Sequence, residues 1–390
     1  MAGTQTPAVS VIIPTYQRRE LVRRAVASAL AQTYRDFELI VVDDGSTDGT
    51  GEALAPLGDR IRYEWQPNRG VAAARNLALR LATGSILAFL DSDDQWLPYH
   101  LAVVTDLLRR HPEAVAASTC PGKDVRGRQG LTDARIEDYR HEPNATRGTI
   151  GFVSCMAVRA EALACVGGFD ERLKVGEDTD LRLKLATVGP YCLLRRRTVR
   201  RQYTSGGLKD RGLESGAYLA AARIHAANLT EAAARLPRPA RAQVEREAHG
   251  LLYASRVRQA LEHHDTALVG ADLEQACRHL PLSDEPRQAE RHLGLDVARG
   301  HRPEKQLREL RTLLELWPEK DSPTEHYLRA RSAVMALRCR MPREAVRLLG
   351  RWRARGTLRF AMRAIPLIYH RVREALQDRR DHAREVAALR

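Results

Sequence analysis

The chain has 390 residues and a formal net charge of +14, with 44% apolar and 5% aromatic residues. This apolar content excludes an intrinsically disordered chain, and the length suffices for two domains with a sizeable core. The basic charge suits phosphate-bearing ligands or an anionic surface, but no basic run is interleaved with aromatic residues, so nucleic-acid binding is not favoured.

The first half of the chain alternates predicted strands and helices. Apolar runs predict strands at 9–14, 37–44, 61–65 and 85–91, and amphipathic patterns predict helices at 19–32 and about 71–82. This alternation is typical of βαβ units, so we expect an α/β domain over residues 1–208, with a mainly parallel sheet and helices on both faces.

Polar residues cluster where these strands end. The motifs are Pro14-Thr15-Tyr16, Asp43-Asp44 and the run from Asp91 to Asp94. Ligands of such sheets bind beyond the carboxyl ends of the strands. Three separate strand ends therefore point to one ligand site.

The second half, residues 209–390, is rich in Ala, Leu, Arg and Glu and is broken by Pro-containing segments. This composition predicts an all-α C-terminal domain. The segment 342–356 has a pattern typical of a tetratricopeptide helix, but no clean repeat period accompanies it, so a solenoid remains one alternative. The segment 356–376 mixes apolar residues with arginines and predicts either a core-packed helix or a basic helix at a membrane surface.

Location follows from what the sequence lacks. No run of about 18 apolar residues is present, and the N-terminus has no charged segment followed by an apolar one. Six cysteines are scattered without a Cys-x-x-Cys pair, which is typical of reduced thiols. We expect a cytoplasmic protein, with peripheral association at the inner face of the membrane left open.

Two segments carry candidate ligand groups near predicted helix starts. In 42–50, Gly45 should turn the chain and Ser46, Thr47 or Asp48 should cap a helix, while Asp44 could accept hydrogen bonds from a base or a ribose. In 67–79, Arg75 is either a solvated helix residue or a group that holds a phosphate or base.

Asp91-Ser92-Asp93-Asp94 is an Asp-x-Asp arrangement directly after a predicted buried strand. Carboxylates spaced this way can chelate Mg²⁺ or Mn²⁺, ions that prefer oxygen ligands and often share them with substrate phosphates. The alternative is a group of acids at the N-terminus of the next helix, which suits the helix dipole. We assign Asp91 and Asp93 to the ligand and metal, and Asp94 to the start of that helix.

Glu177 and Asp178 precede another amphipathic helix. One interpretation is that both acids only stabilise the helix N-terminus. The other is that one of them is a general base that deprotonates an attacking hydroxyl. His100 and His111 do not compete for this role, because both are expected at the surface. Phosphate-loop, Gly-x-Ser-x-Gly and His-Glu-x-x-His motifs are absent from the sequence.

The segments "VSVIIPTYQR", "FELIVVDDGSTDGT", "NRGVAAARNLAL", "ILAFLDSDDQWLP" and "GGFDERLKVGEDTDLRLKL" together resemble glycosyltransferase family 2, inverting enzymes of the GT-A fold, over residues 8–205. The resemblance implies that a nucleotide-diphosphate sugar, usually a UDP-sugar, binds at the sheet. It implies that Tyr16 stacks on the base, that Asp91 and Asp93 bind the ribose and a Mg²⁺ or Mn²⁺ ion, and that Asp178 is the catalytic base. The implied nucleotide-sugar site comprises Pro14, Thr15, Tyr16, Asp44, Arg75, Asp91 and Glu177.

The sequence departs from the family pattern at two places. Gln17 replaces an asparagine that commonly follows the first motif, although it keeps the amide. Gln202 stands near a position where many relatives carry a histidine, so Arg200 or Arg201 is an alternative phosphate ligand. The Gln-x-x-Arg-Trp signature of processive synthases is also absent, which favours single additions.

We therefore predict a non-processive, metal-dependent transferase in bacterial cell-surface polysaccharide or glycoconjugate synthesis. Its partners would be the sugar donor and a glycan or lipid-linked acceptor, without nucleic acid, and self-association is left open. Two alternatives are a nucleotide-sugar-binding regulator or scaffold without turnover, and a membrane- or protein-binding module with a vestigial enzyme domain.

Overall fold

The computed structural model describes residues 7–119, 134–140, 150–202, 217–262, 265–280 and 303–318, with isolated positions from 293 to 332. The chain divides into two compact units, residues 1–248 and 249–390. The first unit continues past residue 208 and includes helix α8 (Ala217–Ala233). The domain boundary at 208 stays a prediction.

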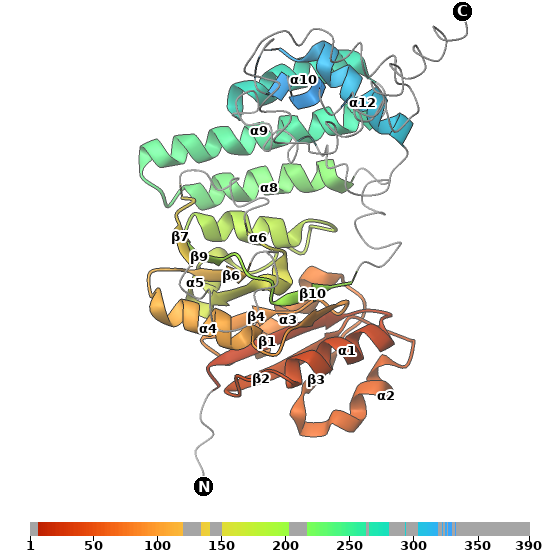
Figure 1. Cartoon of the computed structure of the whole chain (residues 1–390), viewed down its shortest axis with the longest axis vertical. Coiled ribbons are helices and arrows are strands. Elements are labelled where there is room, and N and C mark those ends of the chain that lie inside the picture. Colours follow the sequence, from red (N-terminus) through yellow and green to blue (C-terminus); the bar gives the residue numbers. More distant parts are fainter. Residues whose placement is uncertain are drawn as a thin grey trace, which may run out of the picture. The chain divides into compact units, whose positions relative to one another are not determined.

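An eight-stranded sheet forms the centre of the first unit, in the order β3-β2-β1-β4-β8-β6-β9-β7 (Figure 1). Neighbours from β3 to β4 are parallel, whereas β8 runs antiparallel to both β4 and β6. All residues of β1 are buried, as expected for a parallel strand covered on both faces. The predicted mixed, mainly parallel sheet is confirmed. Its strands are β1 (Val9–Thr15), β2 (Phe37–Asp43), β3 (Arg62–Trp65), β4 (Ile86–Phe89), β6 (Ala116–Thr119), β7 (Arg135–Glu137), β8 (Met156–Arg159) and β9 (Tyr191–Leu194).

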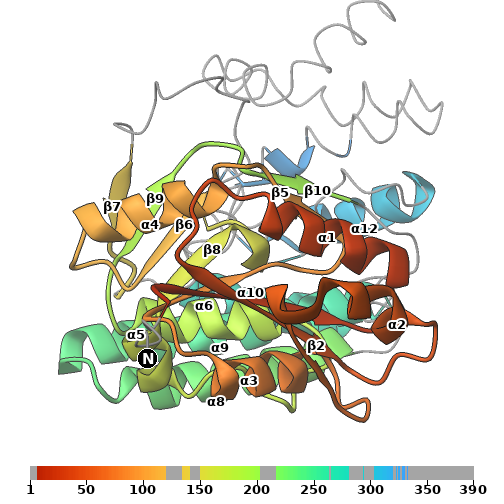
Figure 2. The same ribbon diagram turned by 90° about the horizontal axis from the view of Figure 1, so that it is seen from below.

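Helices cover both faces of this sheet, with α1 and α3 on opposite sides (Figure 2). Alternate residues of β1 point into two separate cores, Val11 into one and Ile12 into the other. The first core contains α1 (Arg19–Leu30), α2 (Thr50–Leu54) and α4 (His100–Arg110), and the 3₁₀ turn η1 (Ala55–Arg60) follows α2. The second contains α3 (Val71–Leu81), α5 (Ala160–Val166), α6 (Glu177–Ala186) and the 3₁₀ turn η4 (Val153–Cys155).

A small antiparallel sheet pairs β5 (Asp94–Trp96) with β10 (Val199–Arg201). Asp94 therefore begins a strand, and the next helix begins only at His100, so the assignment of Asp94 to a helix start is wrong. The expectation of a surface His100 is also wrong. The ring is fully buried, stacks on Trp96 at 4.4 Å between centroids, and lies 2.7 Å from the Thr198 hydroxyl. Asp94 and His100 are buried because the segment 198–201 packs onto β5. This is a tertiary contact, which the local sequence pattern cannot predict.

Helices follow the sheet in the described part of the chain: α8, α9 (Arg238–Glu262), α10 (Thr266–His279) and α12 (Pro303–Leu316). The predicted change from α/β to all-α structure is confirmed. The second unit has its own core, which includes Val257, Leu273, Leu310 and Trp317. The predicted helices at 342–356 and 356–376 lie outside the described residues, and the solenoid stays a prediction. Of the described helices, none combines the length and the apolar character that a membrane crossing requires.

Candidate active site

The first predicted motif lies at the carboxyl end of β1. Pro14 and Thr15 are buried, whereas Tyr16 is 46% exposed. The Thr15 carbonyl accepts a hydrogen bond from the Asp44 amide at 2.8 Å, which continues the pairing of β1 and β2 beyond the strand ends. An exposed aromatic ring beside two paired strand ends is suitably placed for stacking on a planar ligand.

Gln17 connects this motif to the loop after β2. Its amide nitrogen Nε2 donates to Thr47 Oγ1 at 2.9 Å, and its Oε1 accepts from the Thr47 backbone amide at 3.3 Å. The Gln17 backbone has a φ of 52°, a left-handed conformation in which asparagine is better tolerated than glutamine. The Gln17 side-chain amide thus links two loops, although the Gln17 backbone adopts a less favoured conformation.

Asp44 is 4% exposed and holds the segment before α3. Its carboxylate accepts hydrogen bonds from Gln66 Nε2 at 2.6 Å, the Arg69 amide at 2.9 Å and the Gly70 amide at 2.8 Å. Gly45 follows with a φ of 88°, and a Cβ there would stand 2.9 Å from the backbone nitrogen of residue 68. The predicted turn at Gly45 is therefore required by both conformation and space, and Asp44 shapes the wall of the site.

Asp91, Asp93 and Asp94 come together after β4. One carboxylate oxygen of each lies within 4.8 Å of those of the other two. Burial and then the nearby Asp91 charge raise the pKa of Asp94 to about 7, and burial also raises the pKa of Asp93 although Arg18 opposes it. Such crowded oxygens fit a hard divalent cation, which would neutralise their mutual repulsion.

Two further side chains organise this group. Ser154, in η4, donates from Oγ to Asp94 Oδ2 at 2.7 Å and accepts from the Asp91 amide at 3.0 Å. Arg18, just before α1, pairs with Asp93 at 2.9 Å between Nη1 and Oδ2. A neutral hydroxyl and an internal cation therefore hold the aspartates.

Arg75 joins the aspartates to α6. Its guanidinium is 3% exposed and lies 2.7 Å from both Asp91 Oδ1 and Glu177 Oε1. Burial alone would lower the pKa of Arg75. The two carboxylates outweigh burial and raise the pKa above its usual value, so the guanidinium stays charged. The alternative of a solvated helix arginine is wrong, and its role in reading base or phosphate stays a prediction.

Asp178 lies in the first turn of α6 and is partly exposed. Its Oδ2 is 3.7 Å from Arg182 Nη2, a long separation for an ion pair. Arg182, on the same helix, also donates to the carbonyls of Ile150 and Gly151, and these bonds hold its guanidinium in place. Gly176 precedes the helix with a φ of 77°, a left-handed conformation suited to glycine. Asp178 thus keeps an accessible carboxylate beside the buried Glu177.

Asn76 is a site residue whose role the sequence did not predict. Its amide donates to the Phe169 carbonyl at 2.8 Å and accepts from the Phe169 amide at 3.0 Å. The Phe169 ring in turn lies under the Arg75 guanidinium, 5.1 Å from centroid to carbon. A polar residue next to Arg75 in an Ala-rich helix was a weak signal for this contact. For Ser154 and Arg18, no sequence signal was available.

The segment after β9 brings one of the alternative phosphate ligands to this region. Arg201 pairs in strand register with Asp94, and its positive charge partly opposes the rise in the pKa of Asp93 and Asp94 that burial causes. Arg200 and Gln202 are exposed. Of the two arginines, Arg201 is therefore the one beside the aspartates.

Residues 10–167 match the family model of glycosyl transferase family 2. These residues are a family 2 glycosyltransferase domain. The family predicted from the sequence is confirmed, and the eight-stranded sheet of this domain is GT-A-like, as expected. The matched range includes Tyr16, Asp44, Arg75 and Asp91, and it ends before Glu177.

Relatives of the family 2 domain cover only parts of this chain. An uncharacterized glycosyltransferase of Nostoc is 39% identical over 105 residues, 26% of this chain and 33% of that protein. The chondroitin synthase of Escherichia coli is 32% identical over 191 residues, 48% of this chain and 28% of that protein. The matches thus span a third or less of either relative. The solved structure of S. aureus TarS in complex with UDP-GlcNAc aligns with 88% of this chain and 91% of that chain, at 18% identity and a TM-score of 0.49.

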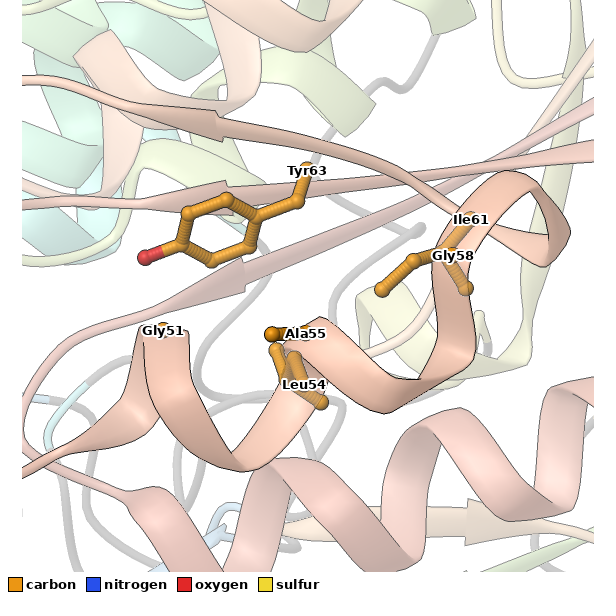
Figure 3. A pocket seen from close by; sticks show the side chains of 6 residues that line it. All are labelled: Gly51, Leu54, Ala55, Gly58, Ile61 and Tyr63. Atoms are coloured by element: carbon orange, nitrogen blue, oxygen red, sulfur yellow. The ribbon is translucent and has the colours of Figure 1, made fainter.

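A small apolar pocket of about 320 Å³ lies apart from the aspartates, between α2, η1 and β3 (Figure 3). It is lined by Gly51, Leu54, Ala55, Gly58, Ile61 and Tyr63. The Tyr63 hydroxyl donates to Asp43 Oδ2 at 2.8 Å, so one wall supports the strand end next to Asp44. None of the site residues predicted from the sequence lines this pocket.

Proposed function

We propose that this protein transfers a sugar from a nucleotide-diphosphate donor, most simply a UDP-sugar, to an acceptor hydroxyl with inversion at the anomeric carbon. The observation that carries the proposal is the buried Arg75, which ties Asp91 to Glu177. Arg75 therefore connects the aspartates proposed to bind the metal with helix α6, which carries Asp178, in one site.

For the donor, we propose that Tyr16 stacks on the base while Pro14, Thr15 and Asp44 form the adjoining wall. Asp91 and Asp93 would hold Mg²⁺ or Mn²⁺, which when bound neutralises charge on the departing diphosphate. Arg201 would add positive charge on the side of Asp94. The crowding of three carboxylates within 4.8 Å supports this assignment.

For the acceptor, we propose that a carboxylate oxygen of Asp178 removes the proton of the attacking hydroxyl. The acceptor hydroxyl oxygen then forms the new bond to the anomeric carbon, while the bond from that carbon to the diphosphate oxygen breaks on the opposite face. The diphosphate leaves with the bonding electron pair and Asp178 keeps the proton, so the configuration inverts without a covalent enzyme intermediate. The accessible position of Asp178 supports this role.

The proposed acceptor is a glycan or a lipid-linked molecule. A relative named as a chondroitin synthase suggests a glycan acceptor and polysaccharide or glycoconjugate synthesis. A lipid-linked acceptor at the membrane is the alternative. We propose one sugar per binding event, which the length distribution of the products would test.

The deciding experiment first screens nucleotide sugars by thermal shift with Mn²⁺ and then measures transfer with the donor that binds. Asp178→Asn should lower transfer at least about 100-fold, because a general base contributes that much or more, while UDP binding is retained. Asp106→Asn, on α4 with only exposed arginine partners at 2.7 and 2.8 Å, is the matched control. Full activity of Asp178→Asn would refute the base assignment, and binding without any turnover would favour a regulator.

A further inference from the structure

Helix α8 lies outside the matched family range, yet it runs beside α6 (Figure 1) and packs against the loop that leads into α6. His225 of α8 is 5% exposed, and its Nε2 lies 3.0 Å from the carbonyl oxygen of Gly176. The carbonyl can only accept, so His225 Nε2 carries the hydrogen and donates. The imidazole also fills the space at Gly176, since a Cβ there would stand 3.1 Å from His225 Cε1.

The carbonyl that His225 contacts is the first acceptor of helix α6. It also accepts the hydrogen bond from the Asp180 amide at 3.0 Å, the bond that closes the first turn. Glu177 and Asp178 lie inside this turn, between the acceptor and the donor. A donor to the Gly176 carbonyl therefore helps to fix the first turn, on which both carboxylates stand.

A second contact from the same helix lies one turn further on. Asn228 Nδ2 donates to Asp170 Oδ2 at 2.8 Å and to Asp180 Oδ1 at 2.9 Å, and its Oδ1 accepts from Arg172 at 3.0 Å. Hydrogen bonds to Arg172 and Asn228 hold the pKa of Asp170 well below its usual range. These bonds fasten α8 to both ends of the segment that precedes and begins α6.

Apolar packing joins the same surfaces. Leu173 and Val175 of the loop form a buried cluster with Ala221 of α8, one turn before His225. Ala221, His225 and Asn228 are spaced four and three residues apart, so they share one face of the helix. One face of α8 thus supplies a packing residue, a histidine donor and an amide to the segment that carries Asp178.

We propose that α8 is part of the catalytic apparatus and that His225 is a positioning residue for Asp178, acting through the Gly176 carbonyl. The inference rests on the proposed function, in which Asp178 is the base. His225 touches neither donor nor acceptor in this account. Its contribution is to hold the first turn of α6 so that the Asp178 carboxylate meets the acceptor hydroxyl.

The test compares His225→Ala, His225→Gln and the control Arg223→Ala, an exposed residue of the same helix. His225→Ala should lower kcat about 10- to 100-fold, with less than a twofold change in the KM for the donor and in UDP affinity. His225→Gln keeps an N–H donor of similar reach and should recover most of kcat, and Arg223→Ala should match the wild type.

Hydrogen exchange of the peptide covering residues 174–186 provides the second readout. His225→Ala should exchange faster there than the wild type, and His225→Gln should resemble the wild type. A kcat of His225→Ala within twofold of the wild type, or a loss that His225→Gln does not recover, would overturn the inference. If the wild type transfers no sugar, the proposed function fails, and unchanged exchange in His225→Ala would separately refute the contact.

Discussion

Two groups of acids in the site are neutralised in different ways. We call Asp91, Asp93 and Asp94 the β4 cluster, and Glu177, Asp178 and Asp180 the α6 cluster. In the α6 cluster each acid has a cation within 4.0 Å, and these cations are Arg75, Arg182 and Lys184. In the β4 cluster, Arg75 and Arg18 pair with two acids, while Asp94 is held by the Ser154 hydroxyl.

The difference indicates two kinds of chemistry. The β4 cluster crowds carboxylate oxygens together, which favours a bound cation. The acids of the α6 cluster lie in the first turn of one helix and are paired with cations of the protein. These cations favour the ionised carboxylate, the form that a general base requires, without a bound metal ion. Arg75 pairs with an acid of each cluster, so its loss would affect both at once.

Arg75→Gln should produce the largest effect. It leaves Asp91 and the buried Glu177 without their common cation, and breaking a buried ion pair costs about 3–5 kcal/mol. Urea unfolding would measure the loss in the free energy of unfolding. Arg80→Gln, exposed on the same helix, should change it by less than about 0.5 kcal/mol. A loss below about 1 kcal/mol in Arg75→Gln would contradict the shared-cation account.

Asp94→Asn should change how the free energy of unfolding depends on pH. The pKa of Asp94 is raised from 3.8 to about 7, so the folded state binds this proton more tightly than the unfolded state. The resulting stabilisation is complete below pH 4 and is lost as the pH rises through 7.

In EDTA, the wild type should therefore lose stability between pH 4 and 7, up to about 4 kcal/mol from this group. Asp94→Asn should have a flatter profile and be the more stable protein at pH 8. Urea unfolding at several pH values is the measurement, with Asp106→Asn as the control. Parallel pH profiles for wild type and Asp94→Asn would exclude this role of Asp94.

Arg18→Gln should alter cation binding at the β4 cluster. The guanidinium lies 2.9 Å from Asp93 and competes with a divalent ion for that carboxylate. Its removal should tighten Mn²⁺ binding about tenfold, equivalent to about 1.4 kcal/mol. Electron paramagnetic resonance of free Mn²⁺ would measure the affinity. Arg23→Gln, exposed on α1, should bind as the wild type does, and weaker binding by Arg18→Gln would show that Arg18 supports the cation site.

The smallest expected effect concerns the loop that presents Arg18. Gln17→Asn removes part of the cost of a left-handed backbone at φ 52° and should add at most about 1 kcal/mol of stability. The shorter side chain must still reach Thr47 for the gain to appear. Thermal unfolding would detect it, with Gln17→Ala, which loses the amide, as the matched variant. Equal melting temperatures for the two variants would argue against the amide link.

The strands and helices around the donor side could be predicted because their signals are local. The expected strand at 9–14 is β1 (Val9–Thr15), and the expected helix at 19–32 is α1 (Arg19–Leu30). The short strands β5 and β10 could not be predicted in this way, since three-residue strands exist only through their pairing. The same pairing explains why the predictions for Asp94 and His100 were wrong.

The residue types of the site could be predicted from the sequence better than the contacts that these residues make. The spacing of Asp91 and Asp93 indicated an oxygen-rich cluster, and the structure brings Asp94 into it. For Arg75 the sequence offered a solvated or a ligand-binding role, whereas its contacts in the structure are two buried ion pairs. Asn76, Ser154 and His225 bond to groups that are far away in the chain, and such contacts leave no spacing pattern in a sequence.

The Arg75 bridge also constrains how this chain could be recombined with its relatives. Arg75 lies on α3, Asp91 follows β4, and Glu177 begins α6, so the two carboxylates are 16 and 102 residues away from the arginine in the chain. A chimera with its crossover between Asp91 and Glu177 would take the bridge from two parents. Such a crossover is tolerated only when both parents carry the same triad in compatible backbone positions, whereas a crossover before α3 or after α6 transfers the bridge intact.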